Sequence, residues 1–427
     1  MRRPILVLGT AIAAAIALAL TGCTGAAPGT GSAKGNGKSV VYSIGQPDTP
    51  AQLASIKADL KDFEKESGVK VTLRVIPNNS SRTLIQTQLR SGNGPDVFQY
   101  DTGPGFAGVL AKAGLLYDLT GHAKTANWTV YNWARNTVTF NGKYYGIPDQ
   151  IEEVGLFYNK DMFTQMGLQP PTTMAALETD AAAIKAAGKI PFAAGNKEGW
   201  EGGHLLSMAL SSRVGPTESK SLVTNQSSWD SDGVKGAIGT WSDFAKQGYL
   251  PASPNAITYD NSNALFYSGK AAMDPTGTWL IQDFKSAVKF DVGFVPFPSA
   301  TGEGIASTDL GGGTFMSASS KNTAAALKLM DYLVSQKHGT WELNHYLIPA
   351  FPLSTTNADV SPLFAEVIKN TAGYTKGSGN VGYNIDVNET DAFNKVMWDG
   401  MQGVLNKTTT PDQLAQKLQT AAQQKTN

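Results

Sequence analysis

The chain has 427 residues, and its 35 Lys and Arg balance its 35 Asp and Glu, so the formal net charge at neutral pH is zero. A single hydrophobic core stops growing at about 250–300 residues, so this length predicts two domains or lobes. A chain without net charge has no bulk field that would attract nucleic acid or an anionic membrane. We therefore expect local recognition of a partner, and a neutral ligand fits the charge balance best.

The start of the chain has the pattern of a secretory signal peptide. Arg2 and Arg3 precede an apolar run over residues 5–20. A run of about 16 residues is short for a membrane-spanning helix but typical of a signal peptide. We expect residues 1–22 to be that signal peptide.

Cys23 is the only cysteine of the chain and follows Leu20-Thr21-Gly22. This segment resembles a bacterial lipobox, in which the cysteine receives a diacylglycerol. Two acyl chains suffice for stable anchoring, so we expect Cys23 to hold the protein on the extracytoplasmic face of the cell membrane. Residues 23–39 are rich in Gly, Ala and Ser and are predicted to be a flexible tether. The alternative is an ordinary signal peptide with an unrelated cysteine.

Strand and helix patterns alternate along the body of the chain. The apolar spacing predicts strands at 39–46, 69–77, 96–101, 142–148, 153–159, 190–195, 271–273, 291–298 and 313–319, and helices at 50–68, 81–92, 173–187, 231–247 and 258–268. Such alternation predicts mainly parallel sheets flanked by helices. Beyond position 322 the pattern is mostly helical. Because no long polar linker interrupts residues 40–427, we expect the chain to cross between the lobes more than once.

The stretch "YSGKAAMDPTGTWL" (267–280) places Trp279 after the strand predicted at 271–273 and a Pro/Gly turn. In open α/β sheets, ligands bind beyond the carboxyl ends of the strands. There an indole face can stack on the apolar face of a sugar ring, and the indole N–H can donate a hydrogen bond. The alternative is a tryptophan that packs at the lobe interface.

Four stretches in chain order carry a family resemblance: "SGNGPDVF" (91–98), "YGIPDQIEEVGLFYNKDMF" (145–163), "FYSGKAAMDPTGTW" (266–279), and "VGFVPFP" followed by residues 309–333. Together they resemble the bacterial extracellular solute-binding proteins of ABC importers, in the carbohydrate-binding branch that includes maltose-binding protein. The resemblance implies a periplasmic-binding-protein-like α/β fold with two lobes, hinge crossovers and a ligand cleft that closes by a hinge motion. Since no stretch of the sequence is predicted to span a membrane or to bind a nucleotide, we expect the permease and its ATPase to be separate chains.

The same resemblance implies the division of the chain into lobes. The N-terminal lobe is expected over 40–149 and 313–355. The C-terminal lobe is expected over 153–308 and 356–427. The ligand implied is a carbohydrate, expected to be an oligosaccharide, bound without a cofactor.

A neutral sugar needs aromatic faces for its C–H surfaces and planar polar side chains for its hydroxyls, and carboxylates accept strongly from hydroxyls. The resemblance implies stacking by Trp279 and Trp200, and hydroxyl binding by Asp101, which ends the strand at 96–101. Glu152 is implied as the cleft carboxylate at the first crossover, with its neighbour Glu153 as the alternative.

Further ligand-binding candidates follow predicted strands, and each has a structural alternative. They are Gln46, Asp48, Tyr100, Glu198 and Gly312. Asp48 would otherwise cap the helix at 50–68, Tyr100 would lie in the core, and Glu198 would be a solvated loop charge. Gly312 belongs to "DLGGGT", whose backbone N–H groups would otherwise form only a hinge turn.

Other functions have weaker support. A polyamine or peptide receptor would share the same lobes, and a polyamine would suit several acids in an aromatic box. A secreted glycosidase would need two carboxylates across a cleft, but Glu152 and Glu153 are adjacent on a strand and point to opposite faces. A scaffold without a ligand is a third class. The four scattered histidines have no partners at metal-binding spacing, so no metal site is expected.

Overall fold

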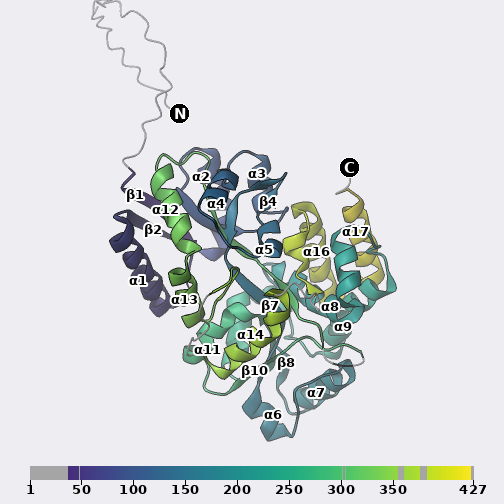
Figure 1. Ribbon diagram of the computed structural model, residues 1–427. Helices are drawn as coiled ribbons and strands as arrows, with labels where there is room; N and C mark the ends of the chain where they lie inside the picture. Colours follow the sequence, from purple (N-terminus) through teal and green to yellow (C-terminus); the bar gives the residue numbers. More distant parts are fainter. Residues whose placement is uncertain are drawn as a thin grey trace, which may run out of the picture.

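The computed structural model describes residues 37–47, 49–300, 302, 304–353, 360–375 and 382–424. Two sheets, each with its own helices, form two lobes that face each other (Figure 1). The first sheet has the strand order β2 (Lys70–Ile76), β1 (Ser39–Gly45), β3 (Val97–Asp101), β12 (Gly312–Met316) and β6 (Gly146–Pro148). A separate two-stranded hairpin joins β4 (Thr139–Phe140) and β5 (Lys143–Tyr144).

The second sheet is built around the long strand β7 (Gln150–Asn159). Its order is β14 (Gly382–Tyr383), β11 (Ser307–Asp309), β7, β9 (Ala271–Gly277) and β8 (Ile190–Phe192), and β10 (Val292–Val295) and β13 (Ile348–Pro349) also pair with β7. The chain passes from the first sheet to the second between β6 and β7, returns between β11 and β12, and passes to the second sheet again between β12 and β13. The first two crossovers lie side by side, since the Asp149 N–H donates to the Gly312 carbonyl at 3.1 Å.

The two-lobed α/β fold class is confirmed, but both sheets are mixed rather than mainly parallel. The pairs β1–β2, β1–β3, β8–β9 and β11–β14 are parallel. The antiparallel pairs outside the hairpin all include β7 or β12. These strands follow the crossovers, so they enter a sheet from the other lobe and run against its strands. Local strand–helix alternation carries no signal for that reversal.

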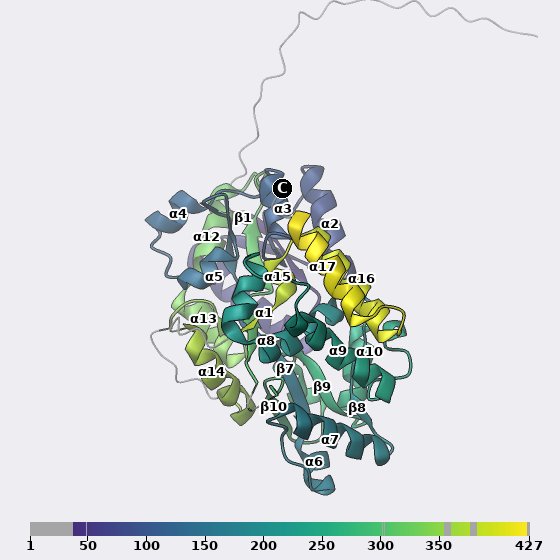
Figure 2. The same cartoon turned by 90° about the vertical axis from the view of Figure 1, so that its right-hand side faces the viewer.

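Helices flank both sheets (Figures 1 and 2). Those around the first sheet are α1 (Pro50–Ser67), α2 (Asn78–Arg90), α3 (Ala107–Lys112), α4 (Thr120–Thr125), α5 (Asn132–Asn136), α12 (Thr323–Leu333) and α13 (Gln336–Asn344). Those around the second are α6 (Lys160–Met166), α7 (Met174–Ala186), α8 (Trp200–Val223), α9 (Asp232–Gln247), α10 (Tyr259–Tyr267), α11 (Ile281–Ala287), α14 (Pro362–Thr375), α15 (Ile385–Asn388), α16 (Asp391–Leu405) and α17 (Pro411–Gln424). Two short 3-10 helices are η1 (Pro254–Ala256) and η2 (Thr278–Leu280). None of the described helices is long and apolar enough to cross a membrane.

Local sequence signals explain where α1 begins and ends. Thr49 accepts a hydrogen bond from the Gln52 N–H, and the Gln52 side chain accepts one from the Thr49 N–H. This reciprocal capping box satisfies two of the N–H groups left free at a helix start. The helix ends at Gly68, whose φ of 68° is left-handed, a conformation that glycine adopts without strain. The helix cap is therefore Thr49.

The second sheet is buried on both faces. Along β7, Leu156 and Tyr158 belong to one apolar cluster, and Phe157 belongs to another. Successive side chains of a strand point to opposite faces, so β7 contributes to both layers. This alternation also determines which of two neighbouring glutamates can reach the space between the lobes.

The strand β9 is longer than the sequence predicts. The expected turn after residue 273 is still strand, because β9 stays paired with β7 through Gly277, and Pro275 lies opposite Leu156. The pairing with β8 ends at Met273. Pro275 therefore lies where one side of β9 is an edge, the place where a strand tolerates a residue without an N–H donor.

Candidate functional site

A cavity of about 250 Å³ lies between the lobes. The first lobe and the returning crossover line it with Arg82, Asp101, Phe106, Gly311 and Gly312, and the second lobe with Glu152, Trp200, His204, Trp279, Asn384, Asp386 and Val387. The cavity combines two indole rings with several charged side chains. Ligand sites are concave in this way, with apolar walls and a few convergent polar groups.

Trp279 is held in one orientation by its neighbours. A Cβ on Gly277 would lie 1.8 Å from Cζ3 of Trp279, so the indole ring folds back over the glycine, where a side chain has no room. The Trp279 indole N–H donates to the Tyr259 hydroxyl at 2.6 Å, and that hydroxyl lies 2.9 Å from the Thr276 hydroxyl. The indole N–H is thus used within the protein, which leaves the ring face to the cavity.

Trp200 lies at the start of α8, and its ring is 4.7 Å from the Tyr259 ring and 5.1 Å from the His204 imidazole. His204 is also 5.3 Å from the Trp279 ring. These four rings form a continuous aromatic wall on the second lobe. Burial, with a smaller effect from the charge of Arg82, lowers the pKa of His204 to about 3, so the imidazole is neutral at physiological pH.

The opposite wall carries a two-point ion pair. Arg82 on α2 donates to Asp101, with Nε 2.7 Å from Oδ2 and Nη2 3.0 Å from Oδ1. The guanidinium carbon lies 4.5 Å from the centre of the Phe106 ring, and Phe106 stacks on Trp398 of α16 in the other lobe. Bidentate pairing fixes the plane of the guanidinium, and stacking on Phe106 holds its face.

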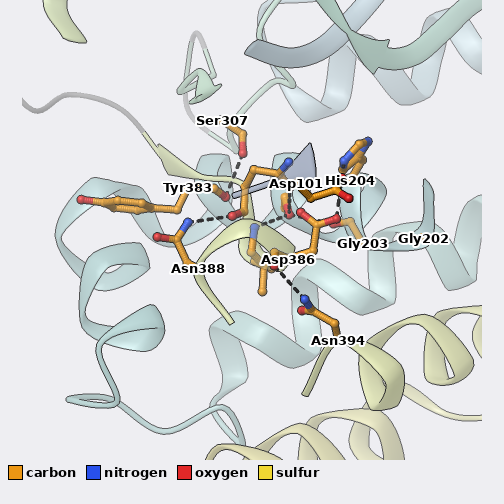
Figure 3. Close-up of polar contacts among 12 residues, drawn as sticks. Asp101, Gly202, Gly203, His204, Ser307, Tyr383, Asp386, Asn388 and Asn394 are labelled. Carbon is orange, nitrogen blue, oxygen red and sulfur yellow. Dashed lines mark hydrogen bonds and ion pairs between the residues drawn. The ribbon is translucent and has the colours of Figure 1, made fainter. Parts of the chain in front are cut away.

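Two carboxyl groups in the cavity make no salt bridge with a lysine or arginine of the described residues, although the charge of Arg82 acts on one of them, Asp386. Glu152 on β7 accepts a hydrogen bond from the Gln150 amide at 2.7 Å. Asp386 on α15 is 6% exposed, and its Oδ1 has no hydrogen-bond partner among the described residues. Its Oδ2 lies 3.7 Å from Nε2 of the neutral His204 (Figure 3). Burial is the main cause that raises the pKa of both groups to about 7.

The neighbour of Glu152 faces the other way. Glu153 is fully buried, and its backbone N–H donates to the Thr278 hydroxyl at 3.0 Å. Burial, followed by the charge of Glu366, raises the pKa of Glu153 to about 8. In this structure Glu152 is therefore the member of the pair that lines the cavity.

The structure brings together five of the residues singled out from the sequence. Trp279, Trp200, Asp101, Glu152 and Gly312 all line the cavity. The Asp101 carboxylate is, however, already paired with Arg82, so only its remaining lone pairs can accept from a ligand.

Three other candidates lie away from the cavity. Gln46 lines a separate hollow of about 230 Å³, and its amide donates to the Pro47 carbonyl at 3.1 Å. Tyr100 is 6% exposed in the first-lobe core, and its hydroxyl accepts from the Gln86 amide at 2.7 Å. Glu198 accepts from the Tyr259 N–H at 3.1 Å, so it supports the start of α10 behind the aromatic wall. Asp48 and Cys23 lie outside the described residues.

Sequence reasoning did not find Arg82, Phe106, His204, Asn384 or Asp386 in the site. Arg82 and His204 lie within helices, where no local pattern marks a side chain that faces a distant lobe. Asp386 lies in a four-residue helix, α15, which is too short to show a helical period in the sequence. Asn384 accepts a hydrogen bond from the Ser207 hydroxyl of α8 at 3.2 Å, a contact between distant segments that no local sequence signal indicates.

Another cavity, of about 150 Å³, lies between the first sheet and α13. Its polar residues include Asp59, Asp149, His338 and Glu342, of which Asp59 and His338 pair at 2.9 Å. We place the site in the 250 Å³ cavity because both lobes and two tryptophans line it. Among the described residues, no group of three or more His, Cys, Asp or Glu side chains is arranged to hold a metal ion.

The family model for bacterial extracellular solute-binding proteins matches residues 46–340. This chain therefore belongs to that family, and the expectation drawn from the four sequence stretches is confirmed. The matched region includes the first two crossovers and the segments that carry Asp101, Glu152, Trp200 and Trp279.

Individual relatives agree with the family. The chain is 30% identical over 300 residues to the multiple sugar-binding protein of Streptococcus mutans, which covers 66% of this chain and 69% of that protein. It is 28% identical to the galactooligosaccharide-binding protein of Bacillus subtilis, over 77% of this chain and 76% of that one. A solved chitin oligosaccharide binding protein shares the fold, with a TM-score of 0.79 over 90% of this chain and 98% of that chain at 22% identity.

Proposed function

We propose that this protein captures a sugar, most simply an oligosaccharide, in the cavity between its lobes and delivers it to the permease of an ABC importer. One observation carries the proposal: the indole faces of Trp279 and Trp200 and the carboxyl group of Glu152 meet in one interlobe cavity. A sugar ring has apolar C–H faces and a rim of hydroxyls, so it needs this combination. Two of the relatives are named as a multiple sugar-binding protein and a galactooligosaccharide-binding protein, which supports the same conclusion.

The proposed mechanism is binding without turnover. The sugar ring stacks on the aromatic wall, while Glu152, Asp386 and the free lone pairs of Asp101 accept hydrogen bonds from its hydroxyls. Both lobes contribute to the cavity, so the bound sugar favours the arrangement in which the lobes are in contact. That arrangement also creates the combined surface that the permease would recognise.

We also propose that the protein works at the outer face of the cell membrane, held by a lipid on Cys23. The lipoprotein names of two pneumococcal relatives support this location. The glycine-rich tether after Cys23 would let the lobes reach the permease.

Thermal unfolding of residues 25–427 against a panel of sugars tests the proposal. The panel contains mono- and oligosaccharides of glucose, galactose, xylose and N-acetylglucosamine, together with spermidine and peptides. A ligand at 100 times its Kd stabilises the folded state by about 2.7 kcal/mol, so one sugar series should raise the Tm by a few degrees. Stabilisation by spermidine or peptides alone would replace the sugar with that solute, and release of shorter sugars on long incubation would indicate a glycosidase.

A further inference from the structure

The charged groups of the cavity do not balance. Its lining contains one cation, Arg82, and three carboxyl groups, Asp101, Glu152 and Asp386, among the residues that the structure describes. His204 adds no charge, because burial keeps it neutral at physiological pH. A ligand that enters this cavity therefore meets an excess of carboxyl groups.

The single cation of the described cavity lining, Arg82, already pairs with a carboxylate of the protein. Arg82 makes two hydrogen bonds to Asp101, and its guanidinium carbon lies over the Phe106 ring. The Asp101 carboxylate already offsets the charge of Arg82, so an anionic ligand that contacted the remaining guanidinium N–H groups would still meet a cavity with more carboxyl groups than cations. The site is thus poorly suited to sugars that carry carboxylate or phosphate groups.

Among the described residues, the other two carboxyl groups make no salt bridge with a lysine or arginine, although the charge of Arg82 partly offsets the effect of burial on the pKa of Asp386. Asp386 is more than nine-tenths buried and leaves Oδ1 without a hydrogen-bond donor in the described part of the chain. In the described part of the chain, Glu152 accepts from the neutral Gln150 amide and, with a smaller effect on its pKa, from the Gly311 backbone N–H. Besides burial, other acidic groups act on both: the charges of Asp149 and Asp101 raise the pKa of Glu152, and those of Asp101 and Asp309 raise the pKa of Asp386, which only Arg82 opposes among the charges of described residues that act on it. A buried carboxylate in this position requires a proton or a donor from the ligand.

We propose that the cavity prefers sugars that carry a free amino group over their hydroxyl or N-acetyl counterparts, and that it rejects uronic acids. This inference rests on the proposed sugar-binding function and names its substrate class. A protonated amine offers three N–H donors and a positive charge. It can therefore satisfy Asp386 and Glu152 at once, whereas a hydroxyl supplies a single donor and leaves the charge unbalanced.

The test compares matched ligands by isothermal titration calorimetry at pH 7. The sets are glucosamine, glucose, N-acetylglucosamine and glucuronic acid, their galacto counterparts, and the β-1,4-linked disaccharides of the gluco series. The amino form is expected to bind at least tenfold more tightly than the hydroxyl form, with no detectable binding of the uronic acids. In Asp386→Asn, the ratio between the amino and hydroxyl forms should fall toward one.

Asp180→Asn is the matched control, because Asp180 is a buried carboxyl group on α7 that lies outside the cavity. It should leave the ratio unchanged, and thermal unfolding of each variant checks that it is folded. If the hydroxyl or N-acetyl form binds as tightly as the amino form, the preference is refuted while sugar binding stands. Tight binding of a uronic acid also refutes it. If no sugar in any set binds, the proposed function fails and the inference fails with it.

Discussion

Gly103 offers a direct test of whether contact between the lobes contributes to ligand binding. It follows β3 of the first lobe with a φ of 81°, and a Cβ on it would lie 1.9 Å from the Val387 carbonyl oxygen of the second lobe. A real Cβ does not approach closer than 3.0 Å, so Gly103→Ala requires a displacement of at least about 1.1 Å, the difference between the two distances. The change should therefore oppose the arrangement in which the lobes touch.

Gly114→Ala is the matched control. Gly114 lies in the same lobe with a φ of 69°, but an added Cβ would meet nothing within 4 Å. Both substitutions place alanine in the left-handed region, which costs about 1–2 kcal/mol. Both variants should thus lose similar stability without ligand, and only Gly103→Ala should also lose lobe contact.

Calorimetry with the sugar found by thermal unfolding measures the consequence. If only part of the Gly103→Ala protein reaches the binding arrangement, its apparent affinity falls in proportion. We expect at least a tenfold loss, which corresponds to about 1.4 kcal/mol, and a larger radius of gyration by X-ray scattering at saturating sugar. Equal affinities of the Gly103 and Gly114 variants would refute this reasoning.

Three further predictions concern other parts of the chain. Gly277→Ala displaces the Trp279 ring, so its sugar affinity should drop at least tenfold, as in Trp279→Ala, and calorimetry would show an unchanged affinity if the ring orientation were irrelevant. Glu153 keeps its proton in the folded state up to about pH 8, because burial raises its pKa to about 8. Its contribution to the free energy of unfolding is therefore lost as the pH rises from about 5 to about 8, by up to about 1.4 kcal/mol per pH unit. Urea unfolding should show a smaller decrease over this range for Glu153→Gln, and equal slopes would contradict the assignment. Cys23→Ala should move the full chain from the detergent phase to the aqueous phase in detergent partitioning, and an unchanged distribution would exclude the lipid anchor.

The elements that the sequence predicts well are those with a one-sided apolar pattern and clear ends. The helix expected at 50–68 is α1, and the helix expected at 231–247 is α9, since each buries one face and ends at a left-handed glycine. The strand expected at 96–101 is β3, which places Asp101 at the edge of the cavity. In these segments local signals and tertiary packing agree.

The elements missed lack such a pattern. Residues 201–212 of α8 are buried on all sides, so no polar face reveals a helical period, and Gly215 and Pro216 interrupt the helix further on. This helix carries Trp200 and His204, so half of the aromatic wall could not be placed on an element in advance. The Arg82–Asp101 pair was missed for a related reason, because it joins a helix to a strand and depends on how they pack.

The neighbouring residues Glu152 and Glu153 show most clearly what the local sequence cannot predict. Strand alternation predicts that only one of Glu152 and Glu153 can reach the cleft, but the choice depends on how β7 pairs with its neighbours. The pairing of Glu153 with Thr308 and of Glu152 with Asp309 in β11 sets that register. A shift by one residue would exchange the two side chains between the cavity and the core.

A crystal structure with the most tightly bound sugar of the panel would show where the ligand lies. We expect a sugar ring against the Trp279 face within the cavity between the lobes, with its polar groups toward Glu152 and Asp386. A sugar bound instead in the hollow beside Gln46, or one that leaves both tryptophan faces uncovered, would contradict this expectation.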